Sequence, residues 1–178
     1  MKNLLSIQKS SFTLAILTLI SFFILSTINS YSQTPADFTD TWKLDLSKSS
    51  TLPHLVSETL VITQKGNDIT INRTLVTTDT KPIISTFIYS IGVVIDDIKS
   101  NTGITTISSS WSADKQTFSV LETFVSDRNG TKQESKRTTV YSMTDKGKTL
   151  NIISDDTLPI GSPTPESERH MKMIFTKS

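Results

Sequence analysis

Two patterns of hydrophobic and polar positions follow one another along the chain. A mainly apolar run extends from Phe12 to Leu25, whereas the sequence from Gln33 onward alternates apolar and polar positions over segments of about six to ten residues. Such alternation places apolar side chains on one face of a β-strand, and clusters of Gly, Asn, Asp or Pro separate the segments, as tight turns require. The pattern predicts strands at residues 41–46, 57–63, 69–77, 83–91, 93–98, 103–111, 116–125, 132–143, 148–154 and 168–177.

The composition of this second part also favours strands over helices. From Gln33 onward it contains 15 Ile, 8 Val and 25 Thr but only two Ala. β-branched side chains lose rotamer freedom in helices and pack well on a pleated sheet. No helical segment long enough to connect parallel strands separates the predicted ones, so we expect an all-β, antiparallel meander. Closure into a lipocalin-like barrel of about 8–10 strands would remove the unpaired edges of such a sheet.

The first 32 residues have the layout of a secretory signal peptide. Lys2 and Lys9 precede the apolar run, and no acidic residue occurs in this segment. The triplet Ser30-Tyr31-Ser32 has small residues at its first and third positions and provides a cleavage point. We therefore predict a signal peptide at residues 1–32, a β-barrel domain at residues 33–178, and export to the periplasm or the extracellular space.

A retained membrane anchor is the alternative interpretation of the same segment. The stretch from Phe12 to Ile28 has 17 residues, which is at the lower edge of the length that spans a bilayer. The run is short and ends in polar residues without a cluster of charges. Cleavage is therefore the favoured prediction, and it leaves no stable membrane span.

Several motifs in the second part resemble a bacterial family. They are DFTDTWKLDLSKSS at residues 37–50, ETLVITQKGNDITINRTL at 58–75, the segment around Trp111, and the late hairpin YSMTDKGKTLNI at 141–152. These motifs are similar to the small lipocalin-like proteins exported by many Gram-negative bacteria, which open with a Gly-Thr-Trp-Lys-Leu-Asn-x-x-Lys-Ser motif. The chain differs at Asp40, where that motif usually has Gly. The resemblance implies a calycin-type β-barrel and export, but no particular activity, because the members are of unknown role.

Composition and charge exclude several classes of protein. A net charge of +1 provides no basic surface for nucleic acid, and the absence of Cys excludes disulfides, zinc ribbons and thiol nucleophiles. The only histidines are His54 and His170, and no Gly-x-Ser-x-Gly elbow or Gly-rich phosphate loop is present. We therefore predict a non-catalytic protein with no cofactor and no metal site.

Charged residues interrupt otherwise apolar strand faces. Arg73 shares a face with Ile and Leu residues, Glu122 shares one with Phe and Val residues, and Arg137 shares one with Tyr141. If these faces point inward, Arg73 and Glu122 form either an ion pair with each other or polar handles inside a ligand cavity. Trp111 ends a strand rich in Ser and Thr, and it packs in the core, caps a rim or lines the mouth of the cavity. The candidate ligand-binding residues are therefore Arg73, Trp111, Glu122, Arg137 and Tyr141.

Two functions are compatible with these features. A barrel that binds a small apolar or amphipathic molecule accounts for the mixed inner faces. A barrel filled by its own side chains would instead be a structural or protein-interaction module of the periplasm or cell surface, which meets a partner through its exterior or through the loop predicted at residues 155–167. The volume of the interior separates the two interpretations, and the oligomeric state stays open.

Overall fold

A computed structural model describes residues 34–50, 54–78, 80–100, 102–128, 131–159 and 169–178. The predicted signal peptide, residues 1–32, lies outside the described residues. The chain divides between Thr34 and Pro35, and the fold given below is that of the unit from Pro35 to Ser178. Within the described part, no helix is both long enough and apolar enough to cross a membrane.

The unit is an all-β meander, as the alternation predicted. Its 10-stranded sheet is entirely antiparallel, and apart from the pairing of β1 with β10 each ladder joins strands that follow one another in the chain. One 3₁₀ turn, η1 (Asp145–Gly147), is the only helical element among the described residues. The strands are β1 (Asp40–Leu44), β2 (Leu55–Lys65), β3 (Asp68–Thr77), β4 (Ile83–Ser90), β5 (Val94–Ser100), β6 (Gly103–Trp111), β7 (Thr117–Arg128), β8 (Thr131–Thr144), β9 (Thr149–Thr157) and β10 (His170–Lys177).

The strands pair in the order β4-β3-β2-β1-β10-β9-β8-β7-β6-β5, so β4 and β5 are the two ends of the sheet. In the part of the chain that the structure describes, no ladder joins these ends, and the predicted closed barrel is not formed by strand pairing. The short connection between them is tied to β6 instead. The amide of Gly92 donates to the carbonyl of Ser109 (3.2 Å), and the Ser109 hydroxyl donates to the carbonyl of Ser90 (3.2 Å).

Strand β9 extends into the segment that the sequence predicted as a loop. We expected a strand at residues 148–154 followed by a loop from Asp155, but β9 continues to Thr157. Its last residues pair with β8, where Arg137 lies opposite Asp156. The acidic residues look like a turn in the sequence, but cross-strand pairing with a basic neighbour keeps them in the sheet.

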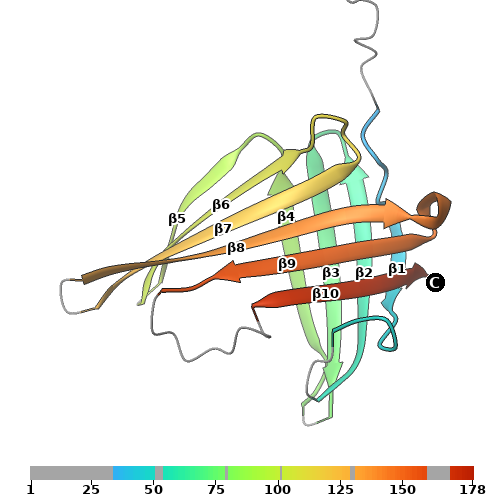
Figure 1. Ribbon diagram of the computed structural model, residues 1–178, viewed down its shortest axis with the longest axis horizontal. Coiled ribbons are helices and arrows are strands. Elements are labelled where there is room, and N and C mark those ends of the chain that lie inside the picture. The colour runs from blue at the N-terminus through green and yellow to red at the C-terminus, as the bar shows by residue number, and fades with distance from the viewer. Residues whose placement is uncertain (1–33, 51–53, 79, 101, 129–130, 160–168) are drawn as a thin grey trace, which may run out of the picture. The chain divides into compact units, whose positions relative to one another are not determined.

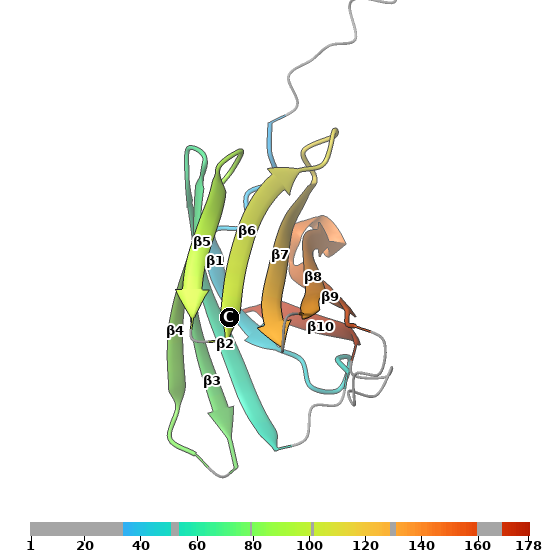
Figure 2. The ribbon, with the colours of Figure 1, turned by 90° about the vertical axis from the view of Figure 1, so that its left-hand side faces the viewer.

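The sheet folds over so that β5–β9 face β1–β4, and the core lies between these halves (Figures 1 and 2). Phe118 of β7 is at its centre, because its ring lies 5.9 Å from Tyr89 of β4 and 5.5 Å from Tyr141 of β8. Aromatic pairs at such distances add stability beyond the area they bury. The other buried apolar side chains in contact with this cluster are Phe38, Trp42, Leu60, Ile62, Ile69, Ile71, Val120, Leu150, Ile152 and Phe175.

Both tryptophans pack beside Phe38. Trp42 is 0% exposed, and its indole N–H donates to the carbonyl of Phe38 at 2.9 Å. The Trp111 ring stacks on the Phe38 ring with centroids 5.7 Å apart, and it also contacts Phe118 at 5.7 Å. Trp111 therefore belongs to the core rather than to an opposite rim. We call this filled region, with Phe38, Trp42, Trp111 and Phe118, the aromatic end of the interior.

Asp40 stands where the motif of the resembling family usually has Gly, two residues before Trp42. Its carboxylate accepts a hydrogen bond from the amide of Thr41 (2.7 Å) and forms an ion pair with Lys177 (2.9 Å). The same ammonium lies 5.3 Å from the centre of the Trp42 ring. The hydrogen bond from Lys177 and then that from Thr41 hold the pKa of Asp40 below its usual value. An acidic side chain therefore has favourable partners where the motif usually has Gly.

Exposed apolar side chains gather on the two end strands. β4 and β5 each have a neighbouring strand on one side only, which leaves side chains less covered than in the middle of a sheet. The most exposed is Ile84, at 75%. The others in this part of the chain are Ile83, Phe87, Ile88, Val93, Val94, Ile95 and Ile98.

Candidate functional site

The inner faces of β2 and β3 change from apolar to charged along their length. On β2 the inner face carries Ile62, Leu60 and then the buried Glu58. On β3 it carries Ile71 and then Arg73. Because Leu60 lies opposite Arg73 in the antiparallel register, both charged residues lie at the same end of the hairpin.

Strands β7, β8 and β9 repeat this change from the other half of the sheet. On β7, Glu122 follows Phe118 and Val120 on the inner face. Glu122 lies opposite Arg137 of β8, and Arg137 lies opposite Asp156 of β9. We call the region with Glu58, Arg73, Glu122, Arg137 and Asp156 the charged end of the interior.

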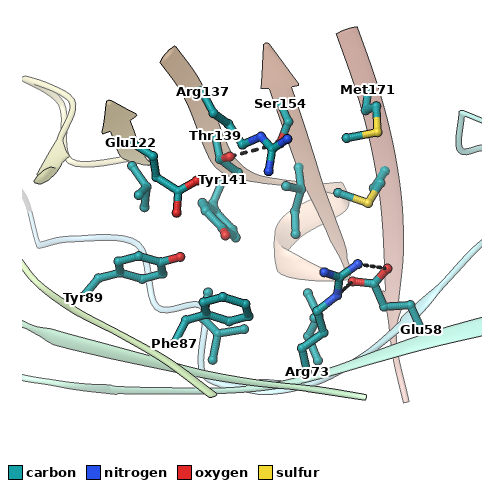
Figure 3. Close-up of a pocket in the computed structure, with 15 residues that line it drawn as sticks. Glu58, Arg73, Phe87, Tyr89, Glu122, Arg137, Thr139, Tyr141, Ser154 and Met171 are labelled. Atoms are coloured by element: carbon teal, nitrogen blue, oxygen red, sulfur yellow. Dashed lines mark hydrogen bonds and ion pairs between the residues drawn. The ribbon is translucent and has the colours of Figure 1, made fainter. Parts of the chain in front are cut away.

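The charged end encloses a hollow of about 350 Å³ (Figure 3). This volume is at the lower end of the range of about 300–1,000 Å³ that is usual for small-molecule sites. Apolar and polar side chains from both halves of the sheet line it. The lining residues are Glu58, Leu60, Ile71, Arg73, Phe87, Tyr89, Val120, Glu122, Arg137, Thr139, Tyr141, Ile152, Ser154, Met171 and Met173.

Arg73 forms an ion pair with Glu58, not with Glu122 as one sequence interpretation proposed. Its Nε lies 2.7 Å from Oε1 of Glu58, and its Nη2 lies 3.2 Å from Oε2. The Glu58 side chain is 3% exposed, so the bidentate partner neutralises a carboxylate that has lost its water. Alternation along the hairpin could have indicated Glu58 as the partner of Arg73. Glu58 and Leu60 share a face of their strand, and Leu60 lies opposite Arg73.

Arg137 forms the second bidentate pair, with Asp156. Nε lies 2.7 Å from Oδ1 and Nη2 lies 2.8 Å from Oδ2. The hydrogen bond to Asp156 raises the pKa of Arg137, whereas burial opposes the rise. The Arg137 side chain is 49% exposed, so this pair lies at the open side of the hollow.

Glu122 has no such partner. In the part of the chain that the structure describes, its carboxylate forms no ion pair and accepts no hydrogen bond. Figure 3 shows this carboxylate directed toward Tyr89 and Tyr141, on the opposite side of the hollow from the pair of Arg73 and Glu58.

Both tyrosine hydroxyls of the hollow stay protonated at neutral pH. Burial, together with the negative charge of Glu122, raises the pKa of Tyr89 to about 12, and a hydrogen bond with Tyr141 opposes part of the rise. Burial raises the pKa of Tyr141 further, with Tyr89 and then Glu122 contributing. In the hydrogen bond between the two hydroxyls one donates to the other, which leaves the proton of the second hydroxyl for a partner in the hollow.

A second hollow, of about 270 Å³, adjoins the first. Glu122 and Arg137 line both, and therefore stand at the boundary between them. The other residues of the second hollow are Thr105, Phe124, Ser135, Lys136, Asp156 and Leu158.

Four of the five candidate residues line the first hollow, namely Arg73, Glu122, Arg137 and Tyr141. Trp111 lines neither hollow and packs at the aromatic end. Sequence reasoning missed Glu58, Tyr89 and Asp156. Glu58 was detectable from alternation along its strand, whereas Asp156 was assigned to a loop and Tyr89 carried no distinguishing signal. The role of the four lining residues in ligand binding stays a prediction.

The described residues include no group of three or more His, Asp and Glu side chains that could hold a metal ion. Asp155 contacts the imidazole of His170 and Asp156 pairs with Arg137, so each member of this acidic pair has a side-chain partner. The polar groups of the hollow are suited to recognising a charged or hydrogen-bonding ligand.

Comparison with known proteins gives a distant likeness. No family model and no curated protein matches the sequence. A REP1-NXSQ fatty acid transporter is similar in structure, with a TM-score of 0.45 and 8% identity over 79% of this chain and 95% of that chain. A fatty-acid-binding protein from Manduca sexta has a TM-score of 0.41 and 10% identity over 79% and 99% of the two chains. One from Drosophila melanogaster brain has a TM-score of 0.42 and 17% identity over 78% and 98%. A likeness this distant does not extend to a ligand, so the proposals below rest on this chain's own residues.

Proposed function

We propose that the protein is a non-catalytic binding protein that holds a small amphipathic molecule in the hollow at the charged end. The observation that carries the proposal is the lining of this hollow, in which aliphatic and aromatic side chains meet charged and hydroxyl groups. Binding sites for small molecules combine an apolar wall with a few convergent polar groups in this way. A molecule with an apolar body and one polar head would be complementary to such a wall.

The hollow also distinguishes the proposal from the alternative of a structural or protein-interaction module. That alternative was based on an interior filled by its own side chains. The interior is filled at the aromatic end but encloses about 350 Å³ at the charged end. Ligand binding is therefore the function that these features support best.

We further propose that the protein acts as an exported, lipocalin-like barrel. The support for export is the sequence of residues 1–32, with two lysines before an apolar run and a small-x-small triplet after it. The support for a barrel is the meander itself, together with the hydrogen bonds that tie the connection between β4 and β5 to β6.

Native mass spectrometry of the protein purified from its own cells tests these proposals. We expect a population whose mass exceeds that of the polypeptide by one small molecule. Thr139→Trp places a large ring in the hollow and should abolish this added mass. The adjacent Thr138 points to the other face of β8, so Thr138→Trp is the matched control and should retain it.

The same spectra give the outcomes that would reject each proposal. A polypeptide without added mass in the wild type, or added mass that Thr139→Trp leaves unchanged, would reject ligand binding in this hollow. The mass of the denatured polypeptide reports on export, since a cleaved chain should begin at Gln33. A mass that includes residues 1–32 would reject cleavage.

A further inference from the structure

The two guanidinium groups of the hollow are already neutralised. Arg73 makes two hydrogen bonds to Glu58, of 2.7 and 3.2 Å, and Arg137 makes two to Asp156, of 2.7 and 2.8 Å. Freeing Arg73 for an anionic ligand would leave the carboxylate of Glu58, 3% exposed, without a partner. An uncompensated buried charge is strongly unfavourable, so the pair of Arg73 and Glu58 is not a ready receptor for a carboxylate or a phosphate. Arg137 already has both of its hydrogen bonds to Asp156.

The charge that remains is negative. In the described part of the chain, Glu122 is the one carboxylate of the hollow that has neither an ion pair nor a hydrogen bond. Arg137 lies opposite Glu122 in the register of β7 and β8, but its guanidinium pairs with Asp156. Lys136, which lines the second hollow, is paired with Glu134. The two arginines and three carboxylates of the charged end therefore leave one negative charge in excess.

Two tyrosines lie near this carboxylate (Figure 3). Tyr89 and Tyr141 line the same hollow, and burial raises the pKa of both, with the negative charge of Glu122 a smaller contribution. The faces of such rings attract cations, and an ammonium group supplies the donors that a carboxylate requires. Aliphatic side chains, among them Leu60 and Ile71, line the same hollow.

We propose that the hollow selects small organic amines, whose protonated head group binds to Glu122 between the tyrosine rings while the apolar body lies on the aliphatic wall. The inference rests on the proposed binding function and specifies the class of ligand. Arg73 and Arg137 are then structural partners of Glu58 and Asp156. A ligand with an anionic head would place like charges together at Glu122.

Three probes of equal chain length test the selection by isothermal titration calorimetry with the full-length protein. Octylamine, octanol and octanoate share an apolar chain and differ in the charge of the head group. We expect octylamine to bind most tightly and octanoate most weakly, with about a tenfold difference between octylamine and octanol, because a charge-assisted hydrogen bond contributes more than a neutral one.

Substitution of Glu122, with a matched control, tests whether this residue is responsible for the preference for amines. Glu122→Gln should weaken octylamine about tenfold and leave octanol unchanged, since the amide keeps the shape of the side chain but removes the charge. Glu134 lies on the neighbouring strand β8 and lines neither hollow, and its ion pair with Lys136 is exposed to solvent, so Glu134→Gln should change neither affinity. Binding of octanol by the Glu122→Gln protein shows that the hollow has kept its form.

The outcomes separate this inference from the proposed function. Octanoate binding at least as tightly as octylamine would overturn the selection for amines while leaving a binding protein. Octylamine affinity that Glu122→Gln leaves unchanged would overturn the role of Glu122. Failure of all three probes to bind would overturn the binding function, and the selection with it.

Discussion

The two ends of the interior differ in what fills them, and strand β7 contributes to both. At the aromatic end, Phe38, Trp42 and Phe118 are each 1% exposed or less. At the charged end, Glu58, Arg73 and Glu122 lie around a hollow of about 350 Å³. A change of two or four residues along a strand therefore moves the inner face from close packing to an open, charged wall.

This difference assigns separate tasks to the two ends. Burial of apolar side chains, the aromatic ones among them, stabilises a chain that has no disulfides. Charged groups inside a protein cost free energy unless they are paired, so they are costly where stability alone is at stake. Their concentration at one end supports the proposal that this end holds the binding site.

The largest effect is expected at the aromatic end. Phe118→Ala removes a ring that contacts Tyr89, Trp111 and Tyr141, and should lower the free energy of unfolding by about 4 kcal/mol. Met171 is half-buried in the wall of the hollow, and Met171→Ala should cost less than about 1 kcal/mol because it enlarges a space that already exists. Urea unfolding followed by circular dichroism measures both values.

Equal losses in these two variants would contradict the division into a filled and an open end. The midpoint of thermal unfolding offers a second measurement. For a chain of this size, the loss expected for Phe118→Ala corresponds to a decrease on the order of 10 °C.

The two arginines of the charged end should differ as well. Arg73→Leu leaves Glu58 buried and unpaired, and should lower the free energy of unfolding by about 3 kcal/mol. Arg137 is 49% exposed, so Arg137→Leu should cost less than about 1 kcal/mol. Chemical denaturation of the two single variants measures the contrast.

A double variant separates lost charge pairing from lost packing. Glu58→Leu combined with Arg73→Leu removes both charges, and it should recover most of the stability lost in Arg73→Leu because no uncompensated charge stays buried. If the double variant is as unstable as the single one, the loss comes from packing of the Arg73 side chain, and the account of the ion pair is wrong.

Much of the fold was predictable because it depends on local features. Alternation and the frequency of β-branched residues located ten strands to within a few residues. The end of β9 was wrong because Asp155 and Asp156 are typical of turns, whereas their place in the sheet depends on partners in β8 and β10. Closure of the sheet depends on the relation of β4 to β5, which no local pattern contains.

The sequence predicted which strand faces carry the charged residues of the site, but not which residues form ion pairs with them. Period two placed Arg73, Glu122 and Arg137 on inner faces of separate strands, and these residues line one hollow. Their ion-pair partners depend on which strands are neighbours and on side-chain directions. Arg73 therefore pairs within its own hairpin with Glu58, whereas one interpretation of the sequence gave Glu122 as its partner.

The smallest expected difference is between two glycine substitutions, and it tests whether part of the charged end is closely packed. Gly103 begins β6 beside Phe124, which lines the second hollow, and a Cβ there would lie 2.3 Å from the carbonyl oxygen of Val125. Gly66, in the β2–β3 turn, has open space around it but a φ of +61°. Gly103→Ala should cost about 2 kcal/mol through overpacking, and Gly66→Ala about 1 kcal/mol through backbone strain, as measured by the urea midpoint. A smaller loss at Gly103 than at Gly66 would mean that β6 and β7 separate freely at this end. The second hollow would then lack the fixed wall that a selective site needs.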